Sequence, residues 1–92
     1  MQMKNVEVFS EASNYAIVRM PGRAYPGCVV QGDTLTSLWR TARRIHDLAI
    51  RAGQEELAGE AEMMVGELDD RLRHYEGVLG EANMSLPYSK RR

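Results

Sequence analysis

The feature that most constrains the fold is a long helical repeat of apolar residues in the second half of the chain. Between residues 54 and 82 these residues follow one another at steps of 4-3-4-4-3-4-3. Such steps place them in one stripe of an α-helix, about 80° wide. A helix over 54–82 would be about 43 Å long at about 1.5 Å per residue, which is long for a small domain. The stripe consists of Leu57, Ala61, Met64, Leu68, Leu72, Tyr75, Leu79 and Ala82.

Another helix is predicted over residues 34–52, directly before the long helix in the chain. Asp33 or Thr34 can accept hydrogen bonds from the free N–H groups of its first turn. Gly53 suits the position just after its last turn. Two helices joined through so short a link are expected to form an antiparallel hairpin. The predicted apolar face of this helix consists of Leu35, Leu38, Trp39, Ala42, Ile45, Ala49 and Ala52.

The N-terminal third predicts β-structure. Its segments at about 3–9, 15–20 and 28–31 are rich in strand-forming residues. Pro21-Gly22 and Pro26-Gly27 are turn signals between them. The predicted fold is therefore α+β, with a three-stranded antiparallel sheet followed by a two-helix hairpin.

The bulk properties narrow the class of protein. A chain of 92 residues is expected to form a single domain over 1–88, with a disordered basic tail at 89–92. The net charge of −1 gives no global attraction to nucleic acid or anionic lipid. Cys28 is the only cysteine, so a disulfide-stapled secreted scaffold is excluded. Without a signal peptide or an apolar run of about 20 residues, a cytoplasmic location and no membrane partner are expected.

We expect no catalytic residues, no metal site and no cofactor, because no pattern of reactive side chains is present. His46 and His74 lie on different predicted helices, and His46 is interpreted as a histidine at the core edge, hydrogen-bonded to backbone. Cys28, Ser10 and Ser13 have no adjacent base in the sequence. The glycines before the first helix match neither the dinucleotide-binding nor the P-loop spacing. The chain is therefore predicted not to be an enzyme.

Charge is distributed unevenly over the two predicted helices. Residues 40–51 contain four arginines and Asp47, whereas residues 54–70 contain only carboxylates among their charged residues. The arginines lie opposite the apolar face and could follow a phosphate backbone. A solvated face is the favoured interpretation, because the following helix is acidic and Trp39 lies on the apolar face. The arginines are Arg40, Arg43, Arg44 and Arg51.

The glycines of the long helix predict a binding surface. Gly59, Gly66, Gly77 and Gly80 fall on the side away from the apolar stripe, although an exposed helical glycine is unfavourable by about 1 kcal/mol against alanine. They would form a strip without side chains, the glycine floor, between two rows of carboxylates. A basic partner could approach the helix backbone closely at this strip. The alternatives are a helix that tolerates glycine because its other face is packed, and a helix that breaks near Gly77–Gly80. The predicted partner-binding residues are Glu55, Glu56, Gly59, Glu60, Glu62, Gly66, Glu67, Asp69, Asp70, Arg23 and Tyr25.

The segments 15–18 and 26–35 resemble HicB-type antitoxins. In that pattern a strand pair leads through P-G-C-x-x-Q-G-D-T-L into a helix, as Pro26 to Leu35 do here. The resemblance implies a small antiparallel sheet backed by a helix, and a protein that neutralises an RNA-cleaving toxin. This chain departs from the pattern, because a long acidic helix replaces the expected next strand and no DNA-binding module follows.

Over its whole length the chain is similar to a family of short uncharacterised bacterial proteins. The shared motifs are Asn14-Tyr15-Ala16-Ile17-Val18, Pro21-Gly22-Arg23, Tyr25-Pro26-Gly27, Gln31-Gly32-Asp33 and Ser85-Leu86-Pro87-Tyr88. Small bacterial domains without catalytic residues often serve as immunity proteins. We therefore expect an immunity or antitoxin protein that binds and inhibits a cognate bacterial toxin. The alternatives are a homo-oligomeric scaffold and a HicB-like nucleic-acid-associated regulator.

Overall fold

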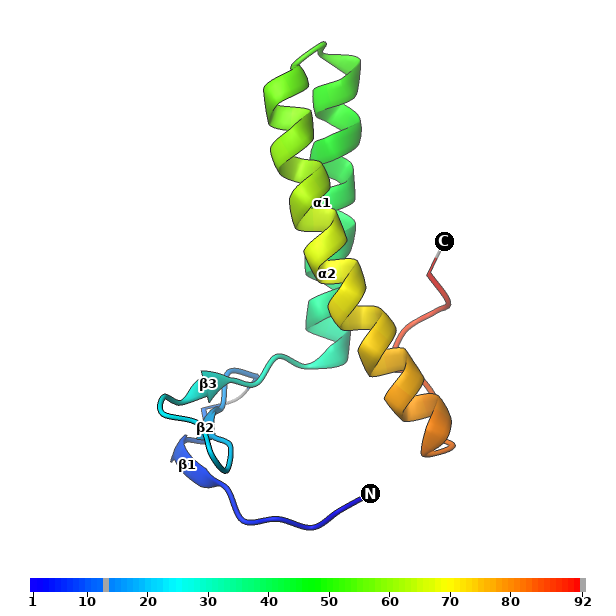
Figure 1. The fold of residues 1–92 in the computed structure, drawn as a ribbon. Coiled ribbons are helices and arrows are strands. Elements are labelled where there is room, and N and C mark those ends of the chain that lie inside the picture. Colours follow the sequence, from blue (N-terminus) through cyan, green and yellow to red (C-terminus); the bar gives the residue numbers. More distant parts are fainter. Residues whose placement is uncertain (13, 92) are drawn as a thin grey trace. The chain divides into compact units, whose positions relative to one another are not determined.

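The structure is a computed structural model, and it describes residues 1–12 and 14–91. It confirms the predicted α+β fold (Figure 1). The contacts divide the chain into two compact units, one of residues 1–31 and one beginning at Gly32. The prediction of a single domain over 1–88 stays a prediction. The elements are β1 (Glu7–Ser10), β2 (Ile17–Arg19), β3 (Gly27–Cys28), α1 (Gly32–Arg51) and α2 (Glu55–Glu81).

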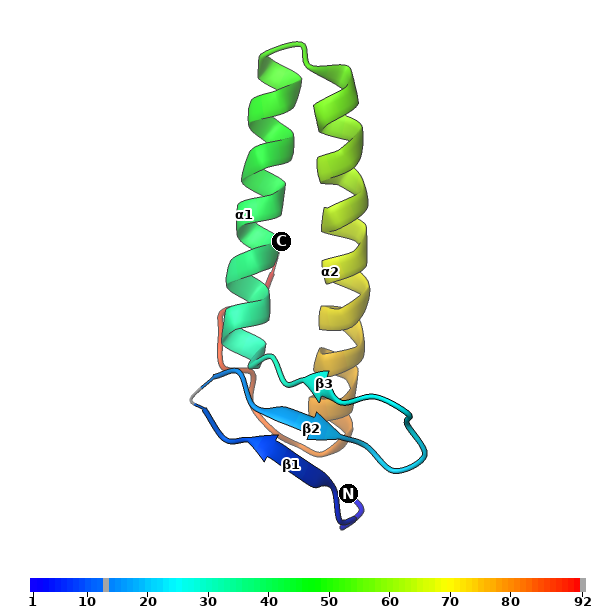
Figure 2. The same cartoon turned by 90° about the vertical axis from the view of Figure 1, so that its left-hand side faces the viewer.

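The first unit is an antiparallel sheet in the order β1-β2-β3 (Figure 2). Its strands are shorter than predicted, and the pairing of β1 with β2 is irregular between Val8 and Ser10. Arg19 links the two strands, because its Nη2 and Nε donate to the Glu7 carboxylate at 2.6 and 3.1 Å. Its guanidinium carbon also lies 5.6 Å from the centroid of the Phe9 ring. The hydrogen bonds to Glu7 raise the pKa of Arg19.

In the second unit α1 and α2 form the predicted antiparallel hairpin (Figure 2). Gly53 has a φ of +68°, which favours glycine. Its N–H donates to the Ile50 carbonyl at 3.1 Å, and the Gln54 N–H donates to the Ala49 carbonyl at 2.9 Å. This pair of bonds is the Schellman motif, which satisfies the last carbonyls of a helix. The predicted role of Gly53 is confirmed.

The long helix α2 is continuous from Glu55 to Glu81, so it does not break at Gly77 or Gly80. It ends in the same way as α1, with Asn83 at a φ of 56° in the place of glycine. The Asn83 N–H donates to Gly80 at 3.1 Å, and the Met84 N–H donates to Leu79 at 2.9 Å. No helix of the described chain has the length and apolar character needed to cross a bilayer.

The N-terminus of α1 lies at Gly32, two residues before the predicted start. Asp33 and Thr34 therefore lie inside the first turn and are not its N-cap, although the Asp33 Oδ1 accepts the Thr34 N–H at 2.9 Å. The Thr36 hydroxyl, which is fully buried, donates to the Gly32 carbonyl at 2.9 Å. Gly32 itself is buried against the ring of Tyr75 from α2.

The buried core of the helical unit is a seam of mostly small residues together with Trp39 and Leu72, and this corrects part of the predicted apolar faces. The large residues Leu38, Ile45, Leu57 and Met64 were assigned to those faces, yet they are 50%, 44%, 51% and 51% exposed. Small side chains let two helix backbones approach closely, which leaves bulky neighbours outside the contact. The buried residues of the helices are Gly32, Thr36, Trp39, Ala42, Ala49, Ala58, Ala61 and Leu72.

We predict that Gly32→Ala destabilises the helical unit by about 1–3 kcal/mol, the usual effect of overpacking. A Cβ at this position would collide with the Tyr75 ring. Gly59→Ala is the matched control, because nothing lies within 4 Å of a Cβ there; it should stabilise α2 by about 0.5–1 kcal/mol. Urea unfolding followed by circular dichroism measures both changes, and an unaltered midpoint for Gly32→Ala would contradict the close approach.

Candidate binding surfaces of the helical unit

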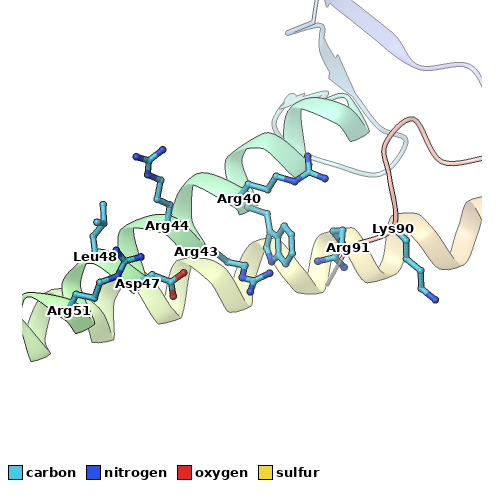
Figure 3. A pocket seen from close by; sticks show the side chains of 9 residues that line it. Arg40, Arg43, Arg44, Asp47, Leu48, Arg51, Lys90 and Arg91 are labelled. Atoms are coloured by element: carbon cyan, nitrogen blue, oxygen red, sulfur yellow. The ribbon is translucent and has the colours of Figure 1, made fainter.

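A basic groove of about 590 Å³ lies beside Trp39, where the C-terminal segment passes α1 (Figure 3). Its walls carry cations from two distant parts of the sequence, because Lys90 and Arg91 join the arginines of α1. Asp47 is the carboxylate among the lining residues. The groove is lined by Trp39, Arg40, Arg43, Arg44, Asp47, Leu48, Arg51, Lys90 and Arg91.

The positive charge of this basic groove is largely unneutralised. Within the described chain, Arg40, Arg44, Arg51 and Lys90 form no ion pair. Uncompensated cations that line one concave surface attract anions and speed their association. The groove can therefore bind an anionic group of a ligand or of a macromolecule.

Trp39 forms the floor between two guanidinium groups. The guanidinium carbons of Arg43 and Arg91 lie 4.9 and 4.6 Å from its ring centroid. Such cation–π contacts hold arginine side chains in place. The buried Nε1–H of Trp39 has no hydrogen-bond acceptor in the described part of the chain.

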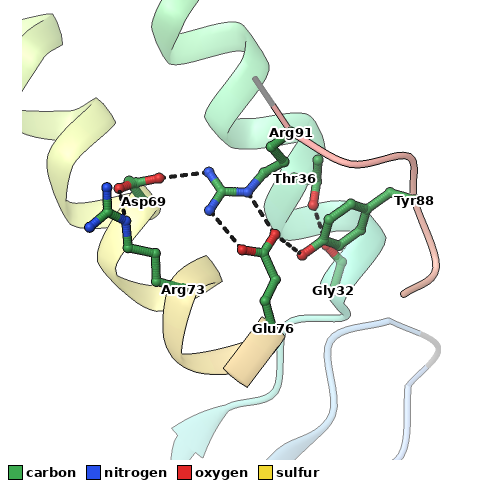
Figure 4. A network of polar contacts seen from close by, with 7 residues as sticks. All are labelled: Gly32, Thr36, Asp69, Arg73, Glu76, Tyr88 and Arg91. Carbon is green, nitrogen blue, oxygen red and sulfur yellow. Dashed lines mark hydrogen bonds and ion pairs between the residues drawn. The ribbon is translucent and has the colours of Figure 1, made fainter. Parts of the chain in front are cut away.

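Arg91 is clamped to α2 by two carboxylates (Figure 4). Its Nε and Nη2 donate to both oxygens of Glu76 at 2.8 and 3.0 Å, and its Nη1 donates to Asp69 at 2.7 Å. The Tyr88 hydroxyl donates to Glu76 at 2.8 Å, and Arg73 pairs with Asp69 at 2.8 Å. Only 9% of the Arg91 side chain is exposed. This clamp fixes the C-terminal segment as one wall of the basic groove.

The contacts within the clamp change the pKa of Glu76, Tyr88 and Arg91. Hydrogen bonds from Arg91 lower the pKa of Glu76, although partial burial opposes this shift. Burial raises the pKa of Tyr88, and its hydrogen bond to ionised Glu76 raises it further. The hydrogen bonds to Glu76 raise the pKa of Arg91 despite its burial. Glu76 is therefore ionised and Arg91 protonated at neutral pH.

The structure places the predicted acidic surface on one stretch of α2, with one difference. Asp69 is 25% exposed and paired with Arg91 and Arg73, so it belongs to the clamp. The remaining carboxylates are exposed and form no ion pair among the described residues. We call them the acidic strip: Glu55, Glu56, Glu60, Glu62, Glu67 and Asp70. The glycines Gly59, Gly66, Gly77 and Gly80 are open to solvent, since a Cβ added at any of them would have no neighbouring atom within 4 Å.

The other predicted contacts, Arg23 and Tyr25, lie in the sheet unit. Both are exposed, and they line a hollow of about 400 Å³ with residues of β2 and β3. Cys28 lines the same hollow as an exposed free thiol. These residues form a surface of the sheet unit alone.

The reactive side chains do not gather into a site in the described chain. His46 is half-buried with its Nδ1 3.8 Å from the Asp47 carboxylate, and His74 is exposed on α2. The Ser10 hydroxyl accepts the Ala12 N–H at 3.2 Å, and Ser13 lies outside the described residues. No group of three or more potential metal ligands occurs among the described residues.

Sequence reasoning missed the clamp and the C-terminal wall of the basic groove, which consists of Lys90 and Arg91. It assigned Arg91 to a disordered tail, whereas the structure buries this side chain between Asp69 and Glu76. Residues 86–91 have neither helical nor strand periodicity, so their sequence pattern does not predict which residues they contact. The adjacency of Tyr88 to the basic residues after it was the one available signal, since an aromatic residue in an extended segment can anchor it to a helix.

The chain belongs to DUF6959, a family of unknown function, whose model matches residues 1–88. This confirms that it is a member of an uncharacterised family. No curated protein and no solved structure matches the chain. None of these comparisons shows a similarity to HicB-type antitoxins, so that local resemblance stays a prediction.

We predict that the clamp makes the stability of the helical unit depend on pH. The pKa of Glu76 is lowered from its ordinary value of 4.5. Its stabilising effect is therefore complete above that value, and it is lost as the pH falls through the lowered pKa of the folded state. Glu76→Gln should remove this loss, which urea midpoints measured between neutral and strongly acidic pH would show.

Arg91→Ala should destabilise the helical unit at neutral pH by about 1–3 kcal/mol, because Glu76 loses its guanidinium partner and Asp69 keeps only Arg73. Arg44→Ala is the control, since Arg44 is exposed and lines the same groove. Equal midpoints for the two variants would show that the clamp contributes nothing.

Proposed function

We propose that this chain is a non-catalytic binding protein of the immunity or antitoxin type, which binds a basic bacterial toxin domain in the cytoplasm and inhibits it. The observation that carries this proposal is the acidic strip of α2. Its carboxylates are exposed, and none of them forms an ion pair among the described residues.

The position of the glycines supports the same surface. Gly59 and Gly66 lie among the acidic residues and are open to solvent, so a partner could approach the helix backbone there. Carboxylates on both sides would direct a basic surface to this floor and raise the association rate. An inhibitor needs only to cover the partner's active surface, and it needs no reactive group of its own.

The test is co-expression with a toxin-like reading frame from the neighbouring gene. The wild-type chain should restore growth, and purified Glu55→Lys/Glu62→Lys should associate with the toxin about tenfold more slowly at low salt, because rim charges act mainly on the association rate. Glu81→Lys, on the same helix beyond the strip, should associate like the wild type. Failure of the wild type to rescue growth or bind would contradict the proposal.

The glycine floor is tested by the same binding measurement. Gly59→Ala and Gly66→Ala should stabilise the helix, since each adds a methyl group into open space. If both variants kept full affinity, the close approach to the backbone would be excluded and the carboxylates alone would account for binding.

A second candidate, a nucleic-acid-associated regulator, is favoured by the basic groove. Arg40, Arg44 and Arg51 follow one another along α1 without ion-pair partners in the described chain, as a phosphate-tracking surface requires.

Fluorescence anisotropy with a labelled single-stranded RNA of about 20 nucleotides tests this candidate. Arg44→Gln/Arg51→Gln should lower the slope of log K against log salt by about 0.7 for each lost phosphate contact. Arg71→Gln, outside the groove, should leave the slope unchanged. Absence of binding by the wild type at low salt would remove the candidate.

A further inference from the structure

The clamp has the composition of a site that recognises arginine (Figure 4). Both carboxylate oxygens of Glu76 accept hydrogen bonds from the Arg91 guanidinium, and Asp69 accepts a third. The guanidinium carbon lies 4.6 Å from the centroid of the Trp39 ring. A planar, forked cation fits such a combination of carboxylates and an aromatic face, whereas the ammonium group of lysine cannot form the paired bonds.

The residues that hold the guanidinium lie on the two helices and border a hollow. Trp39, Asp69 and Glu76 line part of this hollow, which has a volume of about 610 Å³. Trp39 is buried in the seam, and Asp69 is also paired with Arg73 at 2.8 Å. Neither contact depends on Arg91. A guanidinium from outside the chain could therefore meet the same ring and the same carboxylates.

The C-terminal segment that carries Arg91 is attached to the helices mainly by side chains. Within the described chain, none of residues 85–91 forms a backbone–backbone hydrogen bond. The hydrogen bonds of this segment to the helices come from the side chains of Tyr88 and Arg91. Ser89 and Lys90, which lie between them, are exposed. Release of Arg91 therefore breaks no helix or strand.

The two carboxylates of the clamp continue a row that begins in the acidic strip. Glu55, Glu62, Asp69 and Glu76 follow one another at steps of seven residues. Seven residues make nearly two turns of an α-helix, so the four carboxylates lie on one side of α2, about 10.5 Å apart along its axis. Glu55 and Glu62 are exposed and form no ion pair among the described residues. A basic partner that follows this row arrives at the clamp.

We propose that Trp39, Asp69 and Glu76 form a recognition site for an arginine side chain of a basic protein partner, which replaces Arg91 and displaces the C-terminal segment. This inference rests on the proposed function, because it names the group by which the partner of the acidic strip is held. Arg91 is then an internal competitor that lowers the apparent affinity of the partner. Arginines that enter enclosed sites are frequent hot spots of protein interfaces.

The site can be tested without a partner in Arg91→Ala, from which the internal competitor is removed. Trp39 is the only tryptophan of the chain, so its fluorescence reports on this site. N-acetyl-arginine methylamide should change the emission saturably and bind at least about tenfold more tightly than the lysine analogue, because only guanidinium forms the paired bonds. The wild type should bind it at least about fivefold more weakly than the variant, since Arg91 competes. Equal binding of the two analogues to Arg91→Ala would overturn the proposal, as would equal binding of the arginine analogue to the variant and the wild type.

Two glutamates of α2 supply matched variants in the Arg91→Ala background. Glu76→Gln should weaken binding of the arginine analogue at least about tenfold, because the paired acceptor is lost. Glu81→Gln is the control, since Glu81 is exposed and lies beyond the site; it should bind the analogue unchanged. Circular dichroism verifies that each variant is helical. If Arg91→Ala does not fold, Arg91→Lys opens the same site, because its ammonium group fills the site poorly. Unchanged binding by Glu76→Gln would overturn the proposed site.

The exchange itself is tested with the toxin that the growth-rescue experiment identifies. Arg91→Ala should bind this toxin at least about fivefold more tightly than the wild type, since the competitor is removed. Glu76→Gln should bind it at least about tenfold more weakly, as expected for a hot spot. Equal affinity of the toxin for the wild type and both variants would overturn the exchange and leave the proposed function standing. Failure of the growth rescue would contradict the proposed function alone where Arg91→Ala still selects the arginine analogue.

Discussion

The close approach of α1 and α2 is the constraint on which the helical unit depends. Ala42 and Ala49 from one helix, with Ala58 and Ala61 from the other, are buried in the seam, and Gly32 leaves room for the Tyr75 ring where α1 begins. Short side chains bury little apolar surface each, but they allow many contacts between backbones. The same choice of residues leaves several large aliphatic side chains half-exposed, among them Leu38, Ile45, Leu57 and Met64.

The two sides of the hairpin follow from this arrangement. On one side the C-terminal segment returns along the helices, and Arg91 fills the space beside Trp39 with a buried charge that Glu76 and Asp69 compensate. The uncompensated cations of α1 then line the basic groove at its edge. The acidic strip lies on α2, where its carboxylates form no ion pair among the described residues. One hairpin thus carries two surfaces of opposite charge.

The sequence predicted the fold well because its main signals are local. The repeat in residues 54–82 identified α2, and the requirement for a left-handed residue identified the role of Gly53. Periodicity shows which half of a helix is apolar, but it does not show which residues of that half contact the other helix. Leu38 and Leu57 were therefore assigned to the core, although the residues that follow them, Trp39 and Ala58, are the buried ones.

The candidate surfaces were less predictable, since they depend on contacts between distant segments. The acidic strip is contained in one helix, and its residues could be named from spacing alone, although its function as a binding surface stays a prediction. The basic groove needs Lys90 and Arg91 next to α1, some 40 residues away in the chain. Asp69 could not be separated from its acidic neighbours until Arg91 was seen beside it.

The clamp also makes the basic groove depend on the closed hairpin. Arg91 lies 15 residues after Glu76 and 22 after Asp69, and its guanidinium contacts both of these carboxylates on α2 and the Trp39 ring of α1. These contacts can form together only when α1 and α2 are paired. Opening of the hairpin would therefore release the C-terminal segment, and it would separate Lys90 and Arg91 from the arginines of α1 with which they line the groove.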